Sequence, residues 1–314
     1  MLDSFGRRIN YLRISITDRC NLHCVYCKGV AAHFPKADIL SYEEILRLCN
    51  ILAQLGVEHF RITGGEALVR KDCATLVHGL KQFAKTVTLT TNGTVDYITE
   101  LKHAGLDGIN ISLDSTDAAE YASITGADNH SMAMATIKKA VEAGLTTKIN
   151  AVLLEGINHQ QVLPLAKLAE KMPISVRFIE LMPTGANGSL SGVQTENVLA
   201  QLQAKYHDLA PFIAPNSAGP AVYYSSKLML GNVGLISASA SNFCQNCNRI
   251  RLSSTGFLQL CLHSNHGIDL RHLLRNGSND DGIVSAILRS VAEKPKQHQL
   301  HKNVSVQDMS KIGG

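Results

Sequence analysis

The sequence of 314 residues has no long apolar run. None of its apolar stretches approaches the roughly 20 residues that a membrane-spanning helix needs. Its first residues, MLDSFGRRINYLR, also lack the apolar segment of a secretory signal. These two absences predict a protein that enters no membrane and works in the cytoplasm. Because thiols stay reduced there, clustered cysteines are more typical of metal binding or catalysis than of disulfides.

A strong charge of either sign is absent as well. Thirty Lys and Arg against 26 Asp and Glu give a net charge of +4. So small an excess permits an anionic small ligand but does not indicate a nucleic-acid or membrane partner. Hydrophobic residues make up 45% of the chain, which is enough for a sizeable core. The length suits one large domain, or a large domain with a smaller one.

Short apolar runs alternate with amphipathic ones from residue 10 to about residue 182. The amphipathic runs predict helices, and the clearest begins after Ser41, where Glu44 completes a capping box. Further helices are expected near 72–84, 96–104, 131–143 and 160–171. The apolar runs predict strands buried on both faces, at 11–17, 57–63, 87–91, 108–114, 147–154 and 174–182. Strands separated by crossover helices pair in parallel.

The dinucleotide-binding pattern GxGxxG is missing after these strands, which weakens a doubly wound dinucleotide fold. Polar residues gather instead at the C-terminal ends of the strands, where a (β/α) barrel binds its ligands. They are Asp18, Cys20, Gly64, Gly65, Glu66, Thr90, Thr91, Asn92, Ser112, Asp114, Asn150, Glu180 and Met182. The sequence therefore predicts an α/β fold with a partial (β/α)6 barrel of the TIM type over residues 1–210.

The pattern changes in the last third of the chain. A helix is expected over 195–205, followed by short strand-like runs, the last two joined by a turn at Thr255–Gly256. Residues 211–314 are expected to form a smaller C-terminal α+β region. The segment EKPKQHQLHKN (293–303) is interpreted as a solvated basic stretch.

Six of the eight cysteines form two groups, which are Cys20, Cys24 and Cys27, and then Cys244, Cys247 and Cys261. Each group is one short of the four ligands of a structural zinc site. The first group could use His23 as a fourth ligand, although chain neighbours seldom converge on one ion; the second could use His263. A cubane iron–sulfur cluster takes one cysteine per iron, so three cysteines leave one iron open for a small molecule. The spacing C-x3-C-x2-C after the first strand, with GGE after the second, favours the cluster.

The two remaining cysteines, Cys49 and Cys73, lie on or near apolar helix faces and are expected to be packing residues.

Several motifs resemble those of the radical S-adenosylmethionine enzymes, and most closely those of the GTP 3′,8-cyclase family of molybdenum cofactor biosynthesis. The resemblance extends from about residue 6 to residue 262, and the final Gly313–Gly314 is similar to the family's tail. The motifs are GRRINYLRISITDRCNLHCVYC (6–27), FRITGGEALVRKD (60–72), TLTTNG (88–93), INISLD (109–114), RFIELMPTG (177–185) and NFCQNCNRIRLSSTGFLQLCL (242–262).

This resemblance implies that Cys20, Cys24 and Cys27 hold a [4Fe–4S] cluster whose fourth iron binds S-adenosylmethionine. Reductive cleavage of that molecule would release methionine and a 5′-deoxyadenosyl radical. The radical would take the 3′ hydrogen of GTP, and the product would be 3′,8-cyclo-7,8-dihydro-GTP. The positions that match S-adenosylmethionine contacts of the family are Tyr26, Gly65, Ser112 and Met182, where the glycine would let the backbone approach the methionine end.

The second group, Cys244, Cys247 and Cys261, would by the same resemblance hold another [4Fe–4S] cluster, whose open iron binds the guanine of GTP. Guanidinium groups suit phosphate oxygens, and several cations match family contacts to GTP. Read from the residues alone, Lys148, Arg249 and Arg251 are equally consistent with solvated charges. The positions that match GTP contacts are Arg13, Arg61, Thr90, Lys148, Arg249, Ile250 and Arg251.

The family also implies partners: a reduced flavodoxin- or ferredoxin-type electron donor, a downstream cyclic pyranopterin monophosphate synthase, and a second copy in a homodimer. Two positions depart from its pattern, since Ala67 replaces a usual proline and Lys28 a common methionine. Two other functions stay open at this point. One is a different radical S-adenosylmethionine enzyme with an auxiliary cluster, such as one that modifies peptides, and the other is a non-catalytic metal-binding protein.

Overall fold

A computed structural model describes residues 1–27, 33–182, 190–213, 219–237 and 242–297. Its strands form one twelve-stranded sheet in the order β12-β11-β10-β1-β2-β3-β4-β5-β6-β9-β8-β7. The strands are β1 Tyr11–Ser15, β2 His59–Thr63, β3 Thr86–Thr91, β4 Gly108–Ser112, β5 Thr146–Leu153, β6 Ser175–Glu180, β7 Ala210–Phe212, β8 Val222–Ser225, β9 Asn232–Ile236, β10 Arg249–Leu252, β11 Phe257–Gln259 and β12 Gly267–Asp269.

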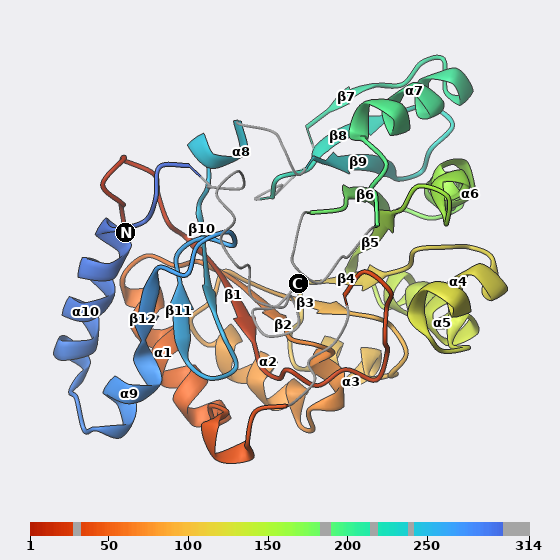
Figure 1. Ribbon diagram of the computed structural model, residues 1–314. Coiled ribbons are helices and arrows are strands. Elements are labelled where there is room, and N and C mark those ends of the chain that lie inside the picture. The colour runs from red at the N-terminus through yellow and green to blue at the C-terminus, as the bar shows by residue number, and fades with distance from the viewer. Residues whose placement is uncertain (28–32, 183–189, 214–218, 238–241, 298–314) are drawn as a thin grey trace.

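The helices connect the first six strands and flank the two ends of the sheet (Figure 1). They are α1 Tyr42–Gln54, α2 Cys73–Lys81, α3 Ile98–His103, α4 Ala118–Thr125, α5 His130–Glu142, α6 Val162–Lys171, α7 Thr195–Lys205, α8 Asn242–Gln245, α9 Leu270–Arg275 and α10 Asp280–Ala292. Short 3-10 helices lie at Lys36–Asp38, Ala67–Val69 and His159–Gln161. Within the described residues, no helix is long and apolar enough to cross a membrane.

The centre of the sheet is the parallel series that the sequence predicts. Strands β1 to β6 lie side by side in chain order, each parallel to the next. Strands that follow one another in the chain are neighbours in the sheet, because each crossover connection returns the chain to the end of the sheet where the previous strand began. The C-terminal ends of all six strands therefore meet on one side, and the fold is α/β with a mostly parallel sheet.

The last third of the chain extends this sheet at both edges. Strand β10 pairs in parallel with β1, and β9 pairs in parallel with β6. Strands β11 and β12 continue one edge with antiparallel pairing, and β8 and β7 continue the other. Figure 1 shows these two additions on opposite sides of the β1–β6 series. Residues far apart in sequence are thus brought next to the first strand.

Helix α1 begins as its sequence predicts. The Ser41 side chain accepts a hydrogen bond from the Glu44 amide at 3.2 Å, and the Glu44 carboxylate accepts one from the Ser41 amide at 2.8 Å. This reciprocal pair satisfies two backbone donors that a helix start leaves without partners. Cys49, on the inner face of the helix, is fully buried in the core, and Cys73 is 5% exposed. Both cysteines are packing residues, as expected.

Two parts of the chain differ from the sequence-based expectations. The helices α4, α8, α9 and α10 were not predicted. The interpretation of 293–303 as solvated is wrong at Lys294, which is 2% exposed, while residues 298–303 lie outside the described residues. Helix α10 buries one apolar face against the sheet edge, and Lys294 follows directly after it. The residues around Lys294 are polar and give no sign of this packing, because the apolar residues that pack belong to α10, earlier in the sequence.

Candidate active site

One large cavity, with a volume of about 1410 Å³, extends along one face of the parallel strands and is lined by residues at both their C-terminal and their N-terminal ends. This exceeds the ~300–1,000 Å³ of a pocket for one small molecule, so there is room for more than one ligand. Every predicted site residue except Ile250 lines it. They are Arg13, Cys20, Cys24, Tyr26, Cys27, Arg61, Gly65, Thr90, Ser112, Lys148, Met182, Cys244, Cys247, Arg249, Arg251 and Cys261.

The first cysteine loop is held against helix α4. The His23 amide donates to the Thr125 carbonyl and the Val25 amide to the Ile124 carbonyl, both at 2.9 Å. The Cys27 amide donates to the Cys24 carbonyl at 3.0 Å, which closes a tight turn between those two cysteines. Backbone hydrogen bonds therefore fix the loop in shape, and its three cysteines, none of them in a disulfide, line the cavity.

The GGE loop after β2 packs on the segment that leads into this cysteine loop. The Gly65 amide donates to the Thr17 carbonyl, and the Glu66 amide to the Arg19 carbonyl, each at 2.8 Å. A Cβ added to Gly65 would lie 2.7 Å from the Arg19 carbonyl carbon and overlap its oxygen. The glycine is thus already required by the approach of two backbones, which is a different reason from the ligand contact that the sequence suggested.

Glu66 and Asn92 connect the loops after β2 and β3 to the cysteines. The buried Glu66 carboxylate accepts hydrogen bonds from the Asn92 amide at 2.6 Å and the Thr91 hydroxyl at 2.8 Å. The Asn92 side chain in turn lies 3.9 Å from the Cys20 sulfur and donates to Asn21 at 2.9 Å. Neither role was assigned from the sequence. The motifs GGE and TNG are thus hydrogen-bonded to each other through Glu66 and Asn92, and Asn92 contacts the cysteine loop.

Tyr26 reaches from the cysteine loop to the end of β4. Its hydroxyl donates to Asp114 Oδ2 at 2.7 Å, while Asp114 Oδ1 accepts from the Val152 amide at 2.8 Å. Burial raises the pKa of Asp114 to about 6, against the lowering effect of these two hydrogen bonds. Burial likewise raises the pKa of the Tyr26 hydroxyl, with the Asp114 charge adding to the effect. The carboxylate therefore anchors the loop at a cost in desolvation.

These thiols suit a metal cluster better than they suit an empty apolar loop. Burial raises the pKa of Cys24, and the nearby Asp114, Cys27 and Cys20 raise it further. Three thiolates there need a cationic partner, which the irons of a cluster provide. The Leu22 amide also donates to the Cys20 sulfur at 3.4 Å, and hydrogen bonds to sulfur are characteristic of iron–sulfur sites. Among the residues that the structure describes, no three Cys, His, Asp or Glu side chains gather as around a single metal ion.

The second cysteine group lies around α8, the start of β10 and the end of β11, and it lines the same cavity as the first group. Cys244 is buried, and Cys247 and Cys261 are half-buried. Burial is the largest single influence on Cys247 and raises its pKa, but the charges of Lys294, Arg249 and Arg7 and the Arg249 amide together lower it below the ordinary value. Burial raises the pKa of Cys261, while the His263 amide and Lys294 act in the opposite direction. Lys294 and Arg249 thus place positive charge beside this group.

The register of four neighbouring strands places three arginines in one row. Arg251 on β10 is paired with Arg13 on β1, which is paired with Arg61 on β2 and then with Thr88 on β3. Residues at one register position of a parallel sheet point to the same face, so the three guanidinium groups share the cavity wall. Burial, with Arg251 and Arg61 next in size, lowers the pKa of Arg13 well below its usual range. Burial, and then Arg249, lowers that of Arg251 to about 10.

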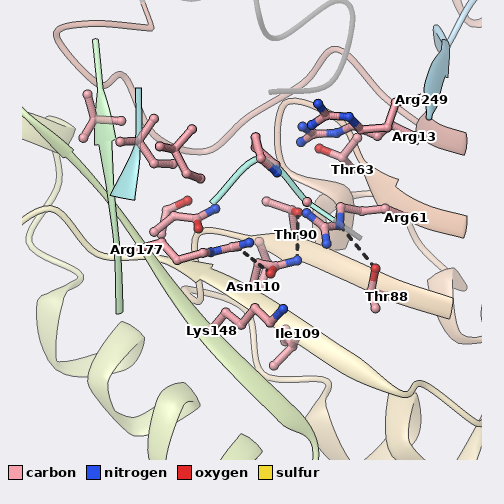
Figure 2. A pocket seen from close by; sticks show the side chains of 18 of the residues that line it. Arg13, Arg61, Thr63, Thr88, Thr90, Ile109, Asn110, Lys148, Arg177 and Arg249 are labelled. Carbon is pink, nitrogen blue, oxygen red and sulfur yellow. Dashed lines mark hydrogen bonds between the residues drawn. The ribbon is translucent and has the colours of Figure 1, made fainter. Parts of the chain in front are cut away.

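Lys148 and Arg177 face this row from the opposite wall, and Figure 2 shows their side chains directed into the same space as Arg13, Arg61 and Arg249. Burial, then Arg177 and Arg61, lowers the pKa of Lys148 to about 8. Arg177 was missed by the sequence analysis. It is 4% exposed, donates to Asn110 at 2.7 Å, and has a pKa lowered to about 10 by burial. Its position inside a strand, as for Arg13 and Arg61, was the available signal.

Ile250 stands apart from the other predicted site residues. Its side chain is 1% exposed and belongs to the core, because alternate residues of β10 point to opposite faces. Arg249 and Arg251 on either side of it line the cavity. Lys28 and the terminal Gly313–Gly314 lie outside the described residues. Ala67 is fully buried at the start of a short 3-10 helix.

Comparison with known families separates the chain into two parts. Residues 14–169 match the Radical SAM superfamily, and residues 174–300 match Molybdenum Cofactor Synthesis C. Among solved structures, a Streptococcus suis SuiB bound to S-adenosylmethionine has a TM-score of 0.68 at 14% identity, covering 91% of this chain and 68% of that one. At such low identity the likeness shows the fold alone.

Curated relatives are similar over the whole length. A GTP 3′,8-cyclase of Pelotomaculum thermopropionicum is 40% identical over 100% of both chains. One of Peptoclostridium acidaminophilum is 42% identical over 100% of this chain and 98% of its own, and one of Clostridium perfringens is 38% identical over 100% of both.

The parallel sheet, with its three-cysteine loop directly after β1, is that of a radical S-adenosylmethionine enzyme. The full-length relatives narrow this class further. The chain belongs to the GTP 3′,8-cyclase family.

Proposed function

We propose that this enzyme converts GTP to 3′,8-cyclo-7,8-dihydro-GTP with S-adenosylmethionine, in the first step of molybdenum cofactor biosynthesis. The observation that carries the proposal is that both cysteine groups and the arginine row line one cavity. The first cysteine group would serve the radical chemistry, the second would bind the purine, and the arginines would bind the triphosphate. The proposed reaction is the one named for the relatives, and the cavity is the proposed place where it occurs.

The N-terminal loop would hold the first cluster through Cys20, Cys24 and Cys27, with S-adenosylmethionine at its open iron. When bound, this pair would supply the 5′-deoxyadenosyl radical that removes the 3′ hydrogen of GTP. The protein keeps the loop in place through α4 and through the hydrogen bond from Tyr26 to Asp114. The remaining proposed contacts to S-adenosylmethionine are the backbone of Gly65 and the side chains of Ser112, Met182 and Tyr26, all on the cavity wall.

The cations of the cavity would bind the triphosphate of GTP. The charges of Arg251 and Arg61 help to lower the pKa of Arg13, which lies between them in the row, so an anion bound there relieves a repulsion that is already present. Lys148 and Arg249 would add charge from other strands, and the Thr90 hydroxyl a neutral contact. Because the Ile250 side chain is in the core, its proposed contact would be made by the main chain.

The second cysteine group would hold another [4Fe–4S] cluster whose open iron takes the guanine. We interpret strands β1–β6 as a partial (β/α)6 barrel of residues 1–210, and residues 211–314 as the region that carries this cluster. A reduced flavodoxin- or ferredoxin-type protein would deliver the electron, and a cyclic pyranopterin monophosphate synthase would take the product. Homodimerisation and a cytoplasmic location are part of the same proposal.

The test is anaerobic incubation of the reconstituted protein with GTP, S-adenosylmethionine and dithionite, followed by mass analysis of the nucleotide. We expect the cyclic product, and about eight irons per chain if two four-iron clusters are present. Cys20→Ala should abolish 5′-deoxyadenosine formation, whereas Cys49→Ala, in the core away from the cavity, should not. Formation of 5′-deoxyadenosine with GTP unchanged would instead indicate another substrate, such as a peptide.

A further inference from the structure

Lys294 is a buried cation that the proposed reaction does not use. It follows helix α10 and is 2% exposed. Lysine is almost never buried to this extent without a partner, because an ammonium group loses much hydration energy when it leaves water. The surroundings of Lys294 therefore indicate why the chain keeps it there.

The ammonium group bridges the two segments that carry Cys247 and Cys261. Its Nζ donates to the Arg249 carbonyl at 2.9 Å and to the Leu260 carbonyl. Arg249 is two residues beyond Cys247, and Leu260 directly precedes Cys261. One side chain thus ties together the two pieces of backbone from which these thiols project.

A second cation connects the remaining cysteine to the same place. The Arg7 guanidinium donates to the Cys244 carbonyl at 2.8 Å and to the Pro295 carbonyl at 2.7 Å, and it is paired with Asp3 at 2.6 Å. Pro295 is the neighbour of Lys294. All three cysteine segments are therefore bound, directly or through one residue, to the chain that follows α10.

We propose that Lys294 is a positioning residue for the second iron–sulfur cluster. It holds the segments of Cys247 and Cys261 at a fixed separation and places positive charge beside the thiolates. The inference rests on the proposed function, since it takes these cysteines as the cluster ligands. Three thiolates in a largely buried site are costly unless a cation accompanies them, and Lys294 is the buried ammonium that touches their backbone. Groups that orient metal ligands affect metal affinity nearly as much as the ligands themselves.

A purely structural role for Lys294 makes a different prediction. In that case the residue would only fasten α10 to the sheet edge, and its loss would lower the melting temperature without changing the cluster. The reduction potential distinguishes the two roles, because it responds to charge near the cluster rather than to overall stability. Loss of a neighbouring positive charge disfavours the added electron and lowers the potential.

The experiment isolates the second cluster by combining Cys20→Ala, Cys24→Ala and Cys27→Ala, which should leave about four irons per chain. In this background Lys294→Met should release iron to a chelator about 10- to 100-fold faster than the parent. Lys294→Gln, which keeps donors but not charge, should lower the midpoint potential. Lys296→Met is the matched control, because Lys296 is exposed, carries the same charge and lies two residues away.

The outcomes are distinct. If Lys294→Met and Lys294→Gln match Lys296→Met in both iron release and potential, the positioning role is wrong. If the background without the first three cysteines takes up no iron, the second cluster itself is absent and the role is lost with it. If Lys294→Met fails to fold after iron removal, as judged by thermal melting, then Lys294→Gln decides: a potential equal to that of the control overturns the proposal.

Discussion

Tyr26 and Asp114 are joined by a hydrogen bond of 2.7 Å that connects the first cysteine loop to the end of β4. The tyrosine lies between two proposed cluster ligands, while the aspartate is held by the Val152 amide of the neighbouring strand. The position of the loop above the sheet therefore depends on a buried carboxylate that burial makes easier to protonate. This relationship can be tested directly.

Tyr26→Phe removes the hydroxyl, so the buried Asp114 Oδ2 loses the hydrogen bond that it accepts from Tyr26. We expect cleavage of S-adenosylmethionine to fall roughly 10-fold, because the orientation of the ligand loop is loosened. Formation of 5′-deoxyadenosine under dithionite measures this, with iron content determined alongside. Tyr97→Phe is the control, since Tyr97 is 45% exposed. Equal rates in both variants would show that the hydrogen bond does not position the loop.

Gly65→Ala should destabilise the protein by about 1–3 kcal/mol, because the added methyl group forces apart two backbones in contact. Denaturant unfolding of the iron-free protein measures the loss. Gly219→Ala provides the comparison, since no atom of the residues that the structure describes lies within 4 Å of a Cβ added there. A Gly65→Ala protein as stable as this control would mean that the loop relaxes without strain.

The affinity for GTP should fall as pH rises through about 8. The pKa of Lys148 is lowered to about 8 by burial, so the side chain is charged below that value and neutral above it. A triphosphate prefers the charged form, and binding is therefore stronger on the acid side. Lys148→Arg should remove this dependence because arginine keeps its charge. Calorimetric titration of GTP at pH 7 and pH 9 measures both, and parallel pH profiles for the two proteins would contradict the role.

Arg249→Ala should weaken GTP binding by about 10-fold or more, as expected when one charged hydrogen-bonding partner of a phosphate is lost. Iron bound at the first cluster should be unchanged, since Arg249 is paired with Tyr11 at the start of β1, whereas that loop follows the other end of the strand. Arg47→Ala is the matched control, because Arg47 pairs with Asp280 at the surface, away from the cavity. Equal GTP affinity in the two variants would remove Arg249 from the site.

Much of the central sheet could be predicted from the sequence, because its strands are apolar runs rich in β-branched residues and are separated by amphipathic helices. The capping box at Ser41 and Glu44 is an example of a local signal that decides a local structure. The cysteine groups were equally visible, since their spacing is a property of the chain. All of these features depend on neighbours in sequence.

The parts that could not be predicted depend on distant contacts. Lys294 looked solvated because its immediate neighbours are polar, whereas in the fold it is buried and bonds to the distant Arg249 and Leu260 carbonyls. The need for Gly65 arises from the approach of the Arg19 backbone, which no pattern near the glycine records. Ile250 was named among contacts from the family resemblance, yet the alternation of β10 turns its side chain into the core.

The parallel pairing of β10 with β1 has a consequence for how the enzyme is made. The first strand of the sheet receives its second neighbour only after more than two hundred further residues have been synthesised. Contacts over such separations form late, since they close a long loop. On the ribosome the N-terminal cysteine loop is therefore complete long before the wall that will face it. A cluster at the proposed second site could form only after Cys261 has been synthesised, long after the first three cysteines.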